Sequence, residues 1–176
     1  ITGQFDLKAG DFFNLDKMQR DENVLRDLYG SQGHIFADIK ATPVFQEEPG
    51  QIDLVYRVDE GELFRVGEIK IHVKGESPQT KRNVVLNRLS LRPGDIIDIR
   101  KVRASERRLK SSQLFIVNPA EGEPPKIVIR PPTLEETEQL AEKRRKVRGQ
   151  SPDDRTGGQP ARDMMIDIFV PSFAPE

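Results

Sequence analysis

The side chains best suited to acid–base chemistry are two histidines, His34 and His72. They lie in different predicted elements with no carboxylate pattern nearby, so we interpret both as ordinary surface or boundary residues. Asp11 and Asp95 recur in a repeated context and could suggest a carboxylate pair. Each follows a turn glycine ahead of a predicted helix, so turn and capping hydrogen bonds explain them better than catalysis does.

Other motifs that carry chemistry are missing from the sequence. No cysteine is present, which excludes thiol nucleophiles, disulfides and cysteine-based metal sites. Neither a Gly-x-Gly-x-x-Gly nor a Gly-Lys-Ser/Thr phosphate-binding motif occurs. The sequence therefore predicts no catalytic residue, no metal site and no cofactor, and we expect the protein not to be an enzyme.

The composition allows only modest cores, because 35% of the residues are hydrophobic and 32% are charged. The formal net charge of −1 argues against binding to nucleic acid or to an anionic membrane surface, since both need clustered positive charge. No apolar run reaches the ~20 residues that cross a bilayer. The chain begins at Ile1, so we expect a fragment or a processed product of a longer protein.

An internal repeat organises the chain. Residues 7–15 (LKAGDFFNL) return 84 positions later as residues 91–99 (LRPGDIIDI). Each copy predicts a turn at a Gly-Asp pair, then a helix with Asn14 or Asp98 as its N-cap. We expect the first helix to end at Gly30 and Gly33 and the second to reach about residue 113. Repeated modules of this kind are typical of binding surfaces in series and are rare in enzymes.

Alternating apolar and polar residues predict the strands that follow the first helix. Residues 35–45 and 52–58 form a predicted hairpin around the turn at 47–50. A third strand is expected over 64–74, then a helix over 78–90 ahead of the second helix of the repeat. Residues 126–130 have strand character as well.

The second copy of the pattern carries an insertion. Residues 166–170 match residues 52–56 at an offset of 114, which exceeds 84 by 30. The extra residues lie at about 131–161 and are strongly charged, with acids ahead of bases. We interpret them as a solvated helix on flexible tethers. The alternative is a basic patch for a partner or for anionic lipid headgroups.

Three features of the sequence resemble the POTRA (polypeptide-transport-associated) domains of BamA-type outer-membrane protein assembly factors. The first is the Leu-x-x-Gly-Asp-x-x-Asn/Asp entry to a helix. The second is the helix end Leu28–Gly33 followed at once by residues 35–39. The third is the junction Tyr56–Gly61, which leads into Val66–Ile69 and closes on Lys74–Gly75. The resemblance covers residues 1–130 and 163–171.

The resemblance implies an α+β fold of tandem β-α-α-β-β units. Each unit would be a three-stranded mixed sheet covered on one face by two helices. We expect one unit over residues 1–62, without its first strand and first helix, and a second over residues 63–176. It also implies a location at the periplasmic face of the outer membrane. The implied partners are unfolded outer-membrane proteins or accessory assembly subunits, with a C-terminal membrane β-barrel in the same protein.

The function implied by the resemblance is non-catalytic binding of an extended client strand at a sheet edge. Each added backbone hydrogen bond contributes only ~0.5–1.5 kcal/mol, which suits weak and sequence-tolerant holding. Phe36 would then either grip a client or cover a neighbouring unit. The expected first edge is Ile35, Phe36, Ala37, Asp38, Ile39, Lys40 and Ala41. The second edge, partly obstructed by the insertion, is Lys126, Ile127, Val128, Ile129 and Arg130.

Other functions stay open from the sequence. The main alternative is a structural spacer that positions a C-terminal membrane β-barrel and its partners. A two-partner secretion transporter or a chloroplast-type import pore would share the same modules. An enzyme would become plausible if the fold placed His72 beside two carboxylates in a pocket.

Overall fold

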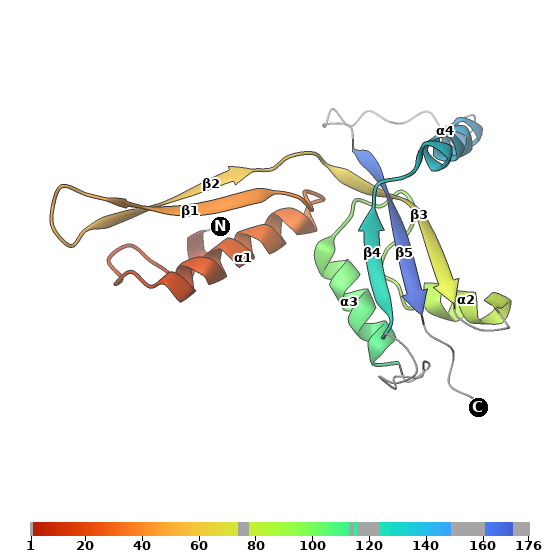
Figure 1. Cartoon of the computed structure of the whole chain (residues 1–176), viewed down its shortest axis with the longest axis horizontal. Coiled ribbons are helices and arrows are strands. Elements are labelled where there is room, and N and C mark those ends of the chain that lie inside the picture. The colour runs from red at the N-terminus through yellow and green to blue at the C-terminus, as the bar shows by residue number, and fades with distance from the viewer. Residues whose placement is uncertain (1, 74–77, 113–114, 116–123, 149–160, 171–176) are drawn as a thin grey trace.

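The computed structural model describes residues 2–73, 78–112, 115, 124–148 and 161–170 (Figure 1). The N-terminal part is a two-stranded hairpin with one helix packed along it. Strands β1 and β2 pair antiparallel, with Asp38 opposite Asp59 and Phe45 opposite Ile52. The elements of this part are η1 (Thr2–Gln4), α1 (Leu15–Ser31), β1 (Asp38–Phe45) and β2 (Ile52–Asp59).

The C-terminal part is a three-stranded mixed sheet in the order β3-β5-β4. The central strand β5 runs parallel to β3 and antiparallel to β4. This arrangement confirms the predicted α+β fold with a mixed three-stranded sheet. Its elements are β3 (Phe64–Val73), α2 (Pro78–Leu86), α3 (Ile99–Lys110), β4 (Lys126–Arg130), α4 (Leu134–Arg148) and β5 (Arg162–Val170).

The main core lies between this sheet and the helices α2 and α3. Alternate residues of the strands point toward the helices, because successive side chains of a strand face opposite ways. Val66, Ile166 and Ile168 pack there with Val85 and Leu109, and each is at most 1% exposed. Intervening residues such as Lys70 and Asp167 face the other side of the sheet, where Glu136 of α4 accepts a hydrogen bond from Lys70 and Asp167 accepts one from Arg130 of β4. Two helices therefore cover one face, and the insertion contributes a third to the opposite face.

The helix entries repeat in detail. The turn glycines Gly10 and Gly94 have φ of 90° and 95°, the left-handed region that favours glycine. In both copies the aspartate carboxylate accepts a hydrogen bond from the backbone N–H three residues earlier, at 3.2 Å for Asp11 and 2.9 Å for Asp95. Asn14 and Asp98 cap the helices as predicted. The two recurring aspartates thus have the turn role expected for them.

A buried polar residue on each repeated helix ties the turn to the helix. Asp21 is fully buried, and its carboxylate accepts hydrogen bonds from the backbone N–H groups of Asp6 at 2.6 Å and Leu7 at 3.1 Å. The residue 84 positions later is Ser105, also fully buried, whose Oγ accepts from the Ser90 N–H at 3.1 Å. In both copies, therefore, a buried side chain of the helix accepts a hydrogen bond from the backbone of the segment before the turn.

Close helix contacts join the two parts. A Cβ added at Gly30 would lie 2.7 Å from Ile99 Cγ2, so α1 approaches α3 there because Gly30 has no side chain. Gly30 was predicted to end the first helix, but it lies inside α1. Gly33, with φ of 100°, is the residue after which the chain turns. Its carbonyl accepts a hydrogen bond from the Phe64 N–H at 3.0 Å, and Asp27 pairs with Arg103 at 2.6 Å.

Two other predicted helices are shorter than expected. The helix predicted over 78–90 is α2, which ends at Leu86, and α3 ends at Lys110 instead of about residue 113. Residue 113 itself lies outside the described residues. Across the described part of the chain, no helix has the length and apolar character needed to span a membrane.

Candidate functional site

The first predicted edge begins later than expected. Ile35, Phe36 and Ala37 belong to a turn closed by a hydrogen bond from the Ala37 N–H to the His34 carbonyl at 3.2 Å. Strand β1 starts at Asp38 and continues to Phe45. The prediction was wrong for these three residues because the alternation of apolar and polar types continues through the turn. Asp38, Ile39, Lys40 and Ala41 are in the strand as predicted.

Phe36 contacts the C-terminal part of the chain. Its ring meets that of Phe64 edge-on, with centroids 5.2 Å apart and an interplanar angle of 88°. This is a favourable arrangement for two aromatic rings. The side chain is still 64% exposed. Of the two interpretations given above, the contact with a neighbouring module is the one that the structure contains.

The outer edge of β1 offers fewer hydrogen-bond donors than its length suggests. Gln46 donates to the carbonyl of Gln51, which marks a hydrogen-bonded pair. Because pairs alternate along an antiparallel ladder, the backbone groups of Ile39, Ala41, Pro43 and Phe45 point away from β2. Pro43 has no N–H. The Ala41 N–H already donates to Glu22 Oε1 on α1 at 2.7 Å.

The outer edge of β2 differs from that of β1. By the same alternation, the backbone groups of Ile52, Leu54, Tyr56 and Val58 point away from β1. No backbone hydrogen bond among the described residues reaches the N–H groups of these four positions. In the C-terminal part, β3 occupies the corresponding edge of β5. Strand β3 also accepts hydrogen bonds from the backbone of the turn at residues 94–97. The corresponding turn of the first copy is residues 10–13, and there the side chain of Phe12 is 97% exposed.

Strand β4 forms the second predicted edge, over the residues expected. Lys126 to Arg130 pair only with β5 in the described sheet, so β4 is an edge strand. The polar contacts between α4 and β4 are confined to Arg130 within the described residues. The described part of the insertion therefore lies mainly against β3 and β5 and does not run along the outer edge of β4.

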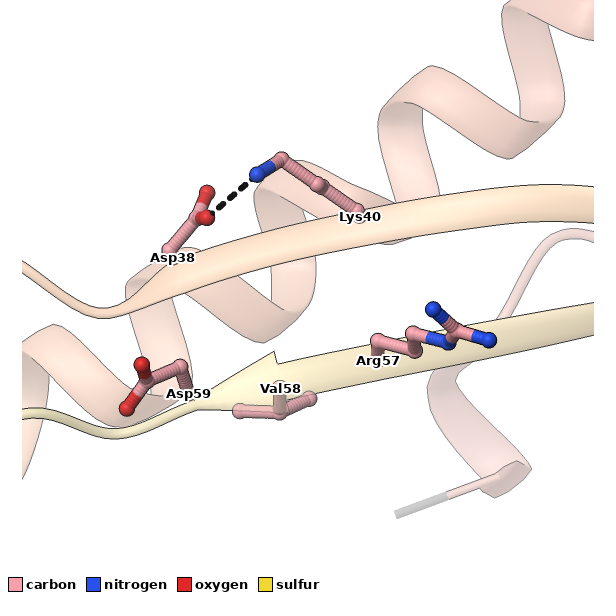
Figure 2. A pocket seen from close by; sticks show the side chains of 5 residues that line it. All are labelled: Asp38, Lys40, Arg57, Val58 and Asp59. Carbon is pink, nitrogen blue, oxygen red and sulfur yellow. Dashed lines mark hydrogen bonds and ion pairs between the residues drawn. The ribbon is translucent and has the colours of Figure 1, made fainter.

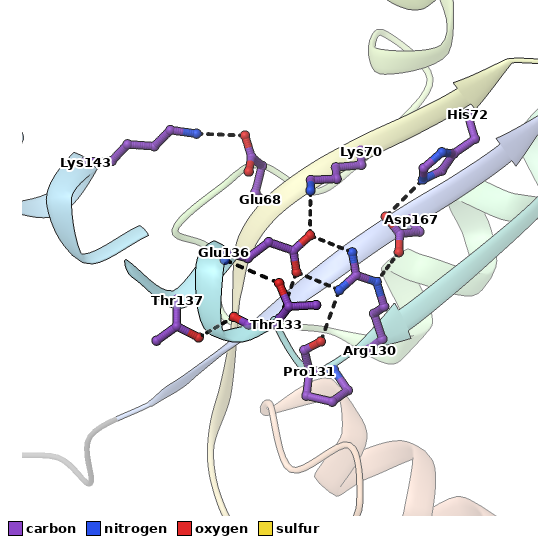
Figure 3. A network of polar contacts seen from close by, with 10 residues as sticks. All are labelled: Glu68, Lys70, His72, Arg130, Pro131, Thr133, Glu136, Thr137, Lys143 and Asp167. Atoms are coloured by element: carbon purple, nitrogen blue, oxygen red, sulfur yellow. Dashed lines mark hydrogen bonds and ion pairs between the residues drawn. The ribbon is translucent and has the colours of Figure 1, made fainter. Parts of the chain in front are cut away.

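The helix of the insertion is docked by a charged network, shown in Figure 3. Arg130 donates two parallel hydrogen bonds to the Glu136 carboxylate, at 2.7 and 2.8 Å, and a third to Asp167. Lys70 of β3 donates to Glu136 as well. Glu136 also forms a capping box with Thr133, in which each backbone N–H is bonded by the other's side chain. Leu140 packs against Gly67, where a glycine leaves room for it.

This docking corrects the prediction of a merely solvated helix. Glu136 and Leu140 are both 7% exposed. Three basic residues of α4 are engaged in ion pairs: Lys143 pairs with Glu68, Arg144 with Asp163, and Lys146 with Glu142. The predicted tethers at residues 149–160 lie outside the described residues.

Hydrogen bonds from Arg130, and then from Lys70, hold the pKa of Glu136 well below its ordinary value of 4.5. A carboxylate with a lowered pKa stabilises the fold above the pKa it has in the unfolded chain, and this contribution is lost only as the pH falls toward the folded-state pKa. We therefore expect α4 to remain docked from neutral pH to well below the ordinary carboxyl pKa, and to undock only as the pH approaches the lowered pKa of Glu136. Amide chemical shifts of α4 recorded over this range measure the transition.

The variant Glu136→Gln is the matched test, because it keeps the shape and removes the charge. We expect its α4 resonances to show the undocked shifts already at neutral pH. The control Glu138→Gln changes an exposed residue of the same helix and should behave like the wild type. If α4 of the wild type undocked at a pH near 4.5, the ordinary pKa of a glutamate, the hydrogen bonds of the network would not be lowering the pKa of Glu136.

His72 lies beside one carboxylate. Its Nε2 is 3.2 Å from Asp167 Oδ1, and its ring stacks on Phe169 at 4.6 Å. Asp167 lies 95 positions from His72 in the sequence, so no local carboxylate pattern indicated this contact. Asp167 also accepts from Arg130, and among the described residues no group of three His, Cys, Asp or Glu side chains is placed to hold a metal ion. The arrangement forms part of the docking network.

A shallow pocket of about 260 Å³ lies on the hairpin (Figure 2). Asp38 and Lys40 of β1 line it together with Arg57, Val58 and Asp59 of β2. Lys40 pairs with Asp38 at 2.7 Å, and both side chains are largely exposed. Since Asp59 accepts from the Gly61 N–H, its carboxylate serves the turn after β2. These contacts do not converge on a ligand position.

Sequence reasoning missed the residues that control the edges and the docking. Thr133-x-x-Glu136 is a capping-box pattern visible in the sequence. Pro43 inside a predicted strand is a visible indication of an edge strand. Nothing in the sequence indicates that Glu22 reaches Ala41.

Asp21 interrupts an apolar helix face, and it also accepts from the Tyr56 hydroxyl at 3.4 Å. Burial and the nearby Asp21 carboxylate raise the pKa of Tyr56 to about 12.

The helix-entry turns, the hairpin and the β3-β5-β4 sheet with two helices on one face define an α+β fold of the POTRA type. The POTRA family model, described as a surface antigen variable number repeat, matches residues 1–61. The outer membrane protein assembly factor BamA of Nitratidesulfovibrio vulgaris is 31% identical over 108 residues, which are 61% of this chain and 13% of that protein. The fold and these matches support a POTRA protein of the BamA type.

Solved structures show the same fold. A crystal structure of Haemophilus ducreyi BamA lacking POTRA domains 1–3 aligns with a TM-score of 0.64 at 15% identity. It covers 95% of this chain and 25% of that one. POTRA domains 3–5 of Haemophilus influenzae BamA align with a TM-score of 0.58 at 14% identity, covering 94% of this chain and 51% of that one. The chain thus spans a minor part of the BamA proteins and about half of the POTRA fragment.

Proposed function

We propose that this chain is a non-catalytic binding module of an outer-membrane protein assembly factor, located at the periplasmic face of the outer membrane. It holds unfolded outer-membrane proteins, or accessory assembly subunits, by adding an extended strand to the edge of one of its sheets. The relationship to BamA supports the general role. The single observation that carries the mechanism is the edge position of β1 and β4, each paired on one side only.

We also propose that residues 1–62 and 63–176 are two repeated units. Support comes from hydrogen bonds that recur 84 positions apart, at Asp11 and Asp95 and at Asp21 and Ser105. In this scheme β1 corresponds to β4 and β2 to β5. The first docking edge is then Asp38–Phe45, which replaces Ile35–Ala41, and the second is Lys126–Arg130.

A second candidate function is that of a spacer that fixes the position of neighbouring domains. The close packing between the N-terminal and C-terminal parts, called the joint below, favours this function. The joint contains Gly30, Gly33 and the ring contact of Phe36 with Phe64. A binding module needs a free edge, whereas a spacer needs only a stiff joint.

An amide NMR titration with a synthetic peptide from a strand of an outer-membrane protein separates these functions. We expect weak binding, with shifts along Asp38–Phe45 or Lys126–Arg130. The control is the same peptide with alternate backbone amides N-methylated, which blocks ladder pairing and should abolish the shifts. Because no described strand pairs with the outer edge of β2, shifts at Ile52–Val58 must be scored separately. No edge shifts at about millimolar peptide would favour the spacer.

A further inference from the structure

The contact between Glu22 and β1 is unusual because a side chain from another element satisfies an edge donor. Glu22 lies on α1, 19 residues before Ala41, and its Oε1 accepts the Ala41 N–H at 2.7 Å. Hydrogen bonds from a backbone N–H to a carboxylate are stronger than those to a neutral carbonyl. An incoming strand that used the Ala41 N–H would first have to displace this carboxylate.

The neighbouring outward position is closed by a different means. Pro43 follows Ala41 on the outer edge and has no N–H to offer. Prolines and charged groups at edges are known devices against unwanted strand pairing. Consequently, the two central outward positions of β1 present no free donor, and Ile39 and Phe45 remain on either side of them.

We propose that Glu22 is an intramolecular gate on the β1 edge, which competes with an extended client strand for the Ala41 N–H. This inference rests on the proposed function and adds its regulation. The client it admits is an extended strand whose carbonyl replaces the Glu22 carboxylate. A partner that moves α1 away from β1 opens the edge, and one that presses α1 onto it closes the edge.

The first test needs no client. Amide hydrogen exchange at Ala41 is compared in the wild type, Glu22→Ala and Glu22→Gln. We expect exchange to be about tenfold faster in Glu22→Ala, because a charge-assisted hydrogen bond is lost. Glu22→Gln keeps a neutral acceptor and should lie in between. Asp16→Asn removes one charge from the same helix and should leave Ala41 unchanged. Unchanged exchange in Glu22→Ala would overturn the gate whatever clients do.

The second test uses the outer-membrane strand peptide. Glu22→Ala should bind it several-fold more tightly at Asp38–Phe45, and Glu22→Ala with Pro43→Val more tightly still. Faster exchange at Ala41 with no gain in affinity overturns the gate but leaves client binding intact. If no variant binds the peptide at this edge, strand addition at β1 is wrong and the gate fails with it. Amide spectra matching the wild type away from β1 establish that each variant is folded.

Discussion

Replacing Gly33 by alanine should lower the free energy of unfolding by roughly 2–4 kcal/mol. Two effects add at this position. Its φ of 100° is a conformation that a residue with a Cβ adopts only at a cost. The added Cβ would also lie 2.6 Å from Ile96 Cγ2 and 2.7 Å from Leu63 Cδ1, so these two side chains must at least move. Urea unfolding followed by circular dichroism measures the change.

Gly50→Ala is the matched control for backbone strain. Gly50 has a φ of 88°, and nothing lies within 4 Å of an added Cβ. Its replacement should cost about 1 kcal/mol, from strain alone. The difference between the two variants therefore reports the packing of the joint. Equal losses in both would mean that the joint at Gly33 is not tightly packed, and the spacer function would lose its main support.

The Gly33 variant also bears on the arrangement of the two parts. Leu63 and Ile96 belong to the C-terminal part, whereas Gly33 follows the helix of the N-terminal part. A shift that relieves the clash should therefore change the angle between the parts. Residual dipolar couplings of the two parts, measured on the wild type and the variant, would reveal that change.

The second large effect is expected for Asp21→Ala, which should cost about 1–3 kcal/mol. The carboxylate is fully buried and accepts the N–H groups of Asp6 and Leu7, which hold the segment before the first turn onto α1. Removing it takes away these two charge-assisted hydrogen bonds and the longer one from the Tyr56 hydroxyl, and leaves a small void. Urea unfolding gives the free energy, and amide exchange at Asp6 and Leu7 locates the loss.

The repeat supplies the comparison for this variant. Ser105→Ala removes the corresponding acceptor in the C-terminal part, where a neutral hydroxyl accepts one backbone N–H, from Ser90, and a longer bond from the Arg108 side chain. That change should cost about 1 kcal/mol, because a neutral hydrogen bond contributes less than a charged one. A loss for Asp21→Ala no larger than that for Ser105→Ala would contradict the special strength assigned to the carboxylate.

Local features of this protein could be predicted from the sequence because each depends on residues close together in the chain. The turn glycines Gly10 and Gly94, the caps Asn14 and Asp98, and the alternation of the hairpin all follow from short-range sterics and hydrogen bonding. Because the same local pattern occurs twice, these features also predicted repeated units of one fold. The mixed three-stranded sheet agrees with that prediction.

What the tertiary structure decided lies between segments far apart in the chain. Ile35–Ala37 form a turn ahead of the strand, although apolar and polar residues alternate through the turn as they do along the strand. The helix of the insertion is docked because Arg130, Glu136 and Lys70 meet across three elements, and no local pattern encodes that meeting. Access to the β1 edge is likewise set by Glu22, a residue on another element. Local sequence thus determined which segments become strands, and long-range packing determined which strand edges are left for a partner.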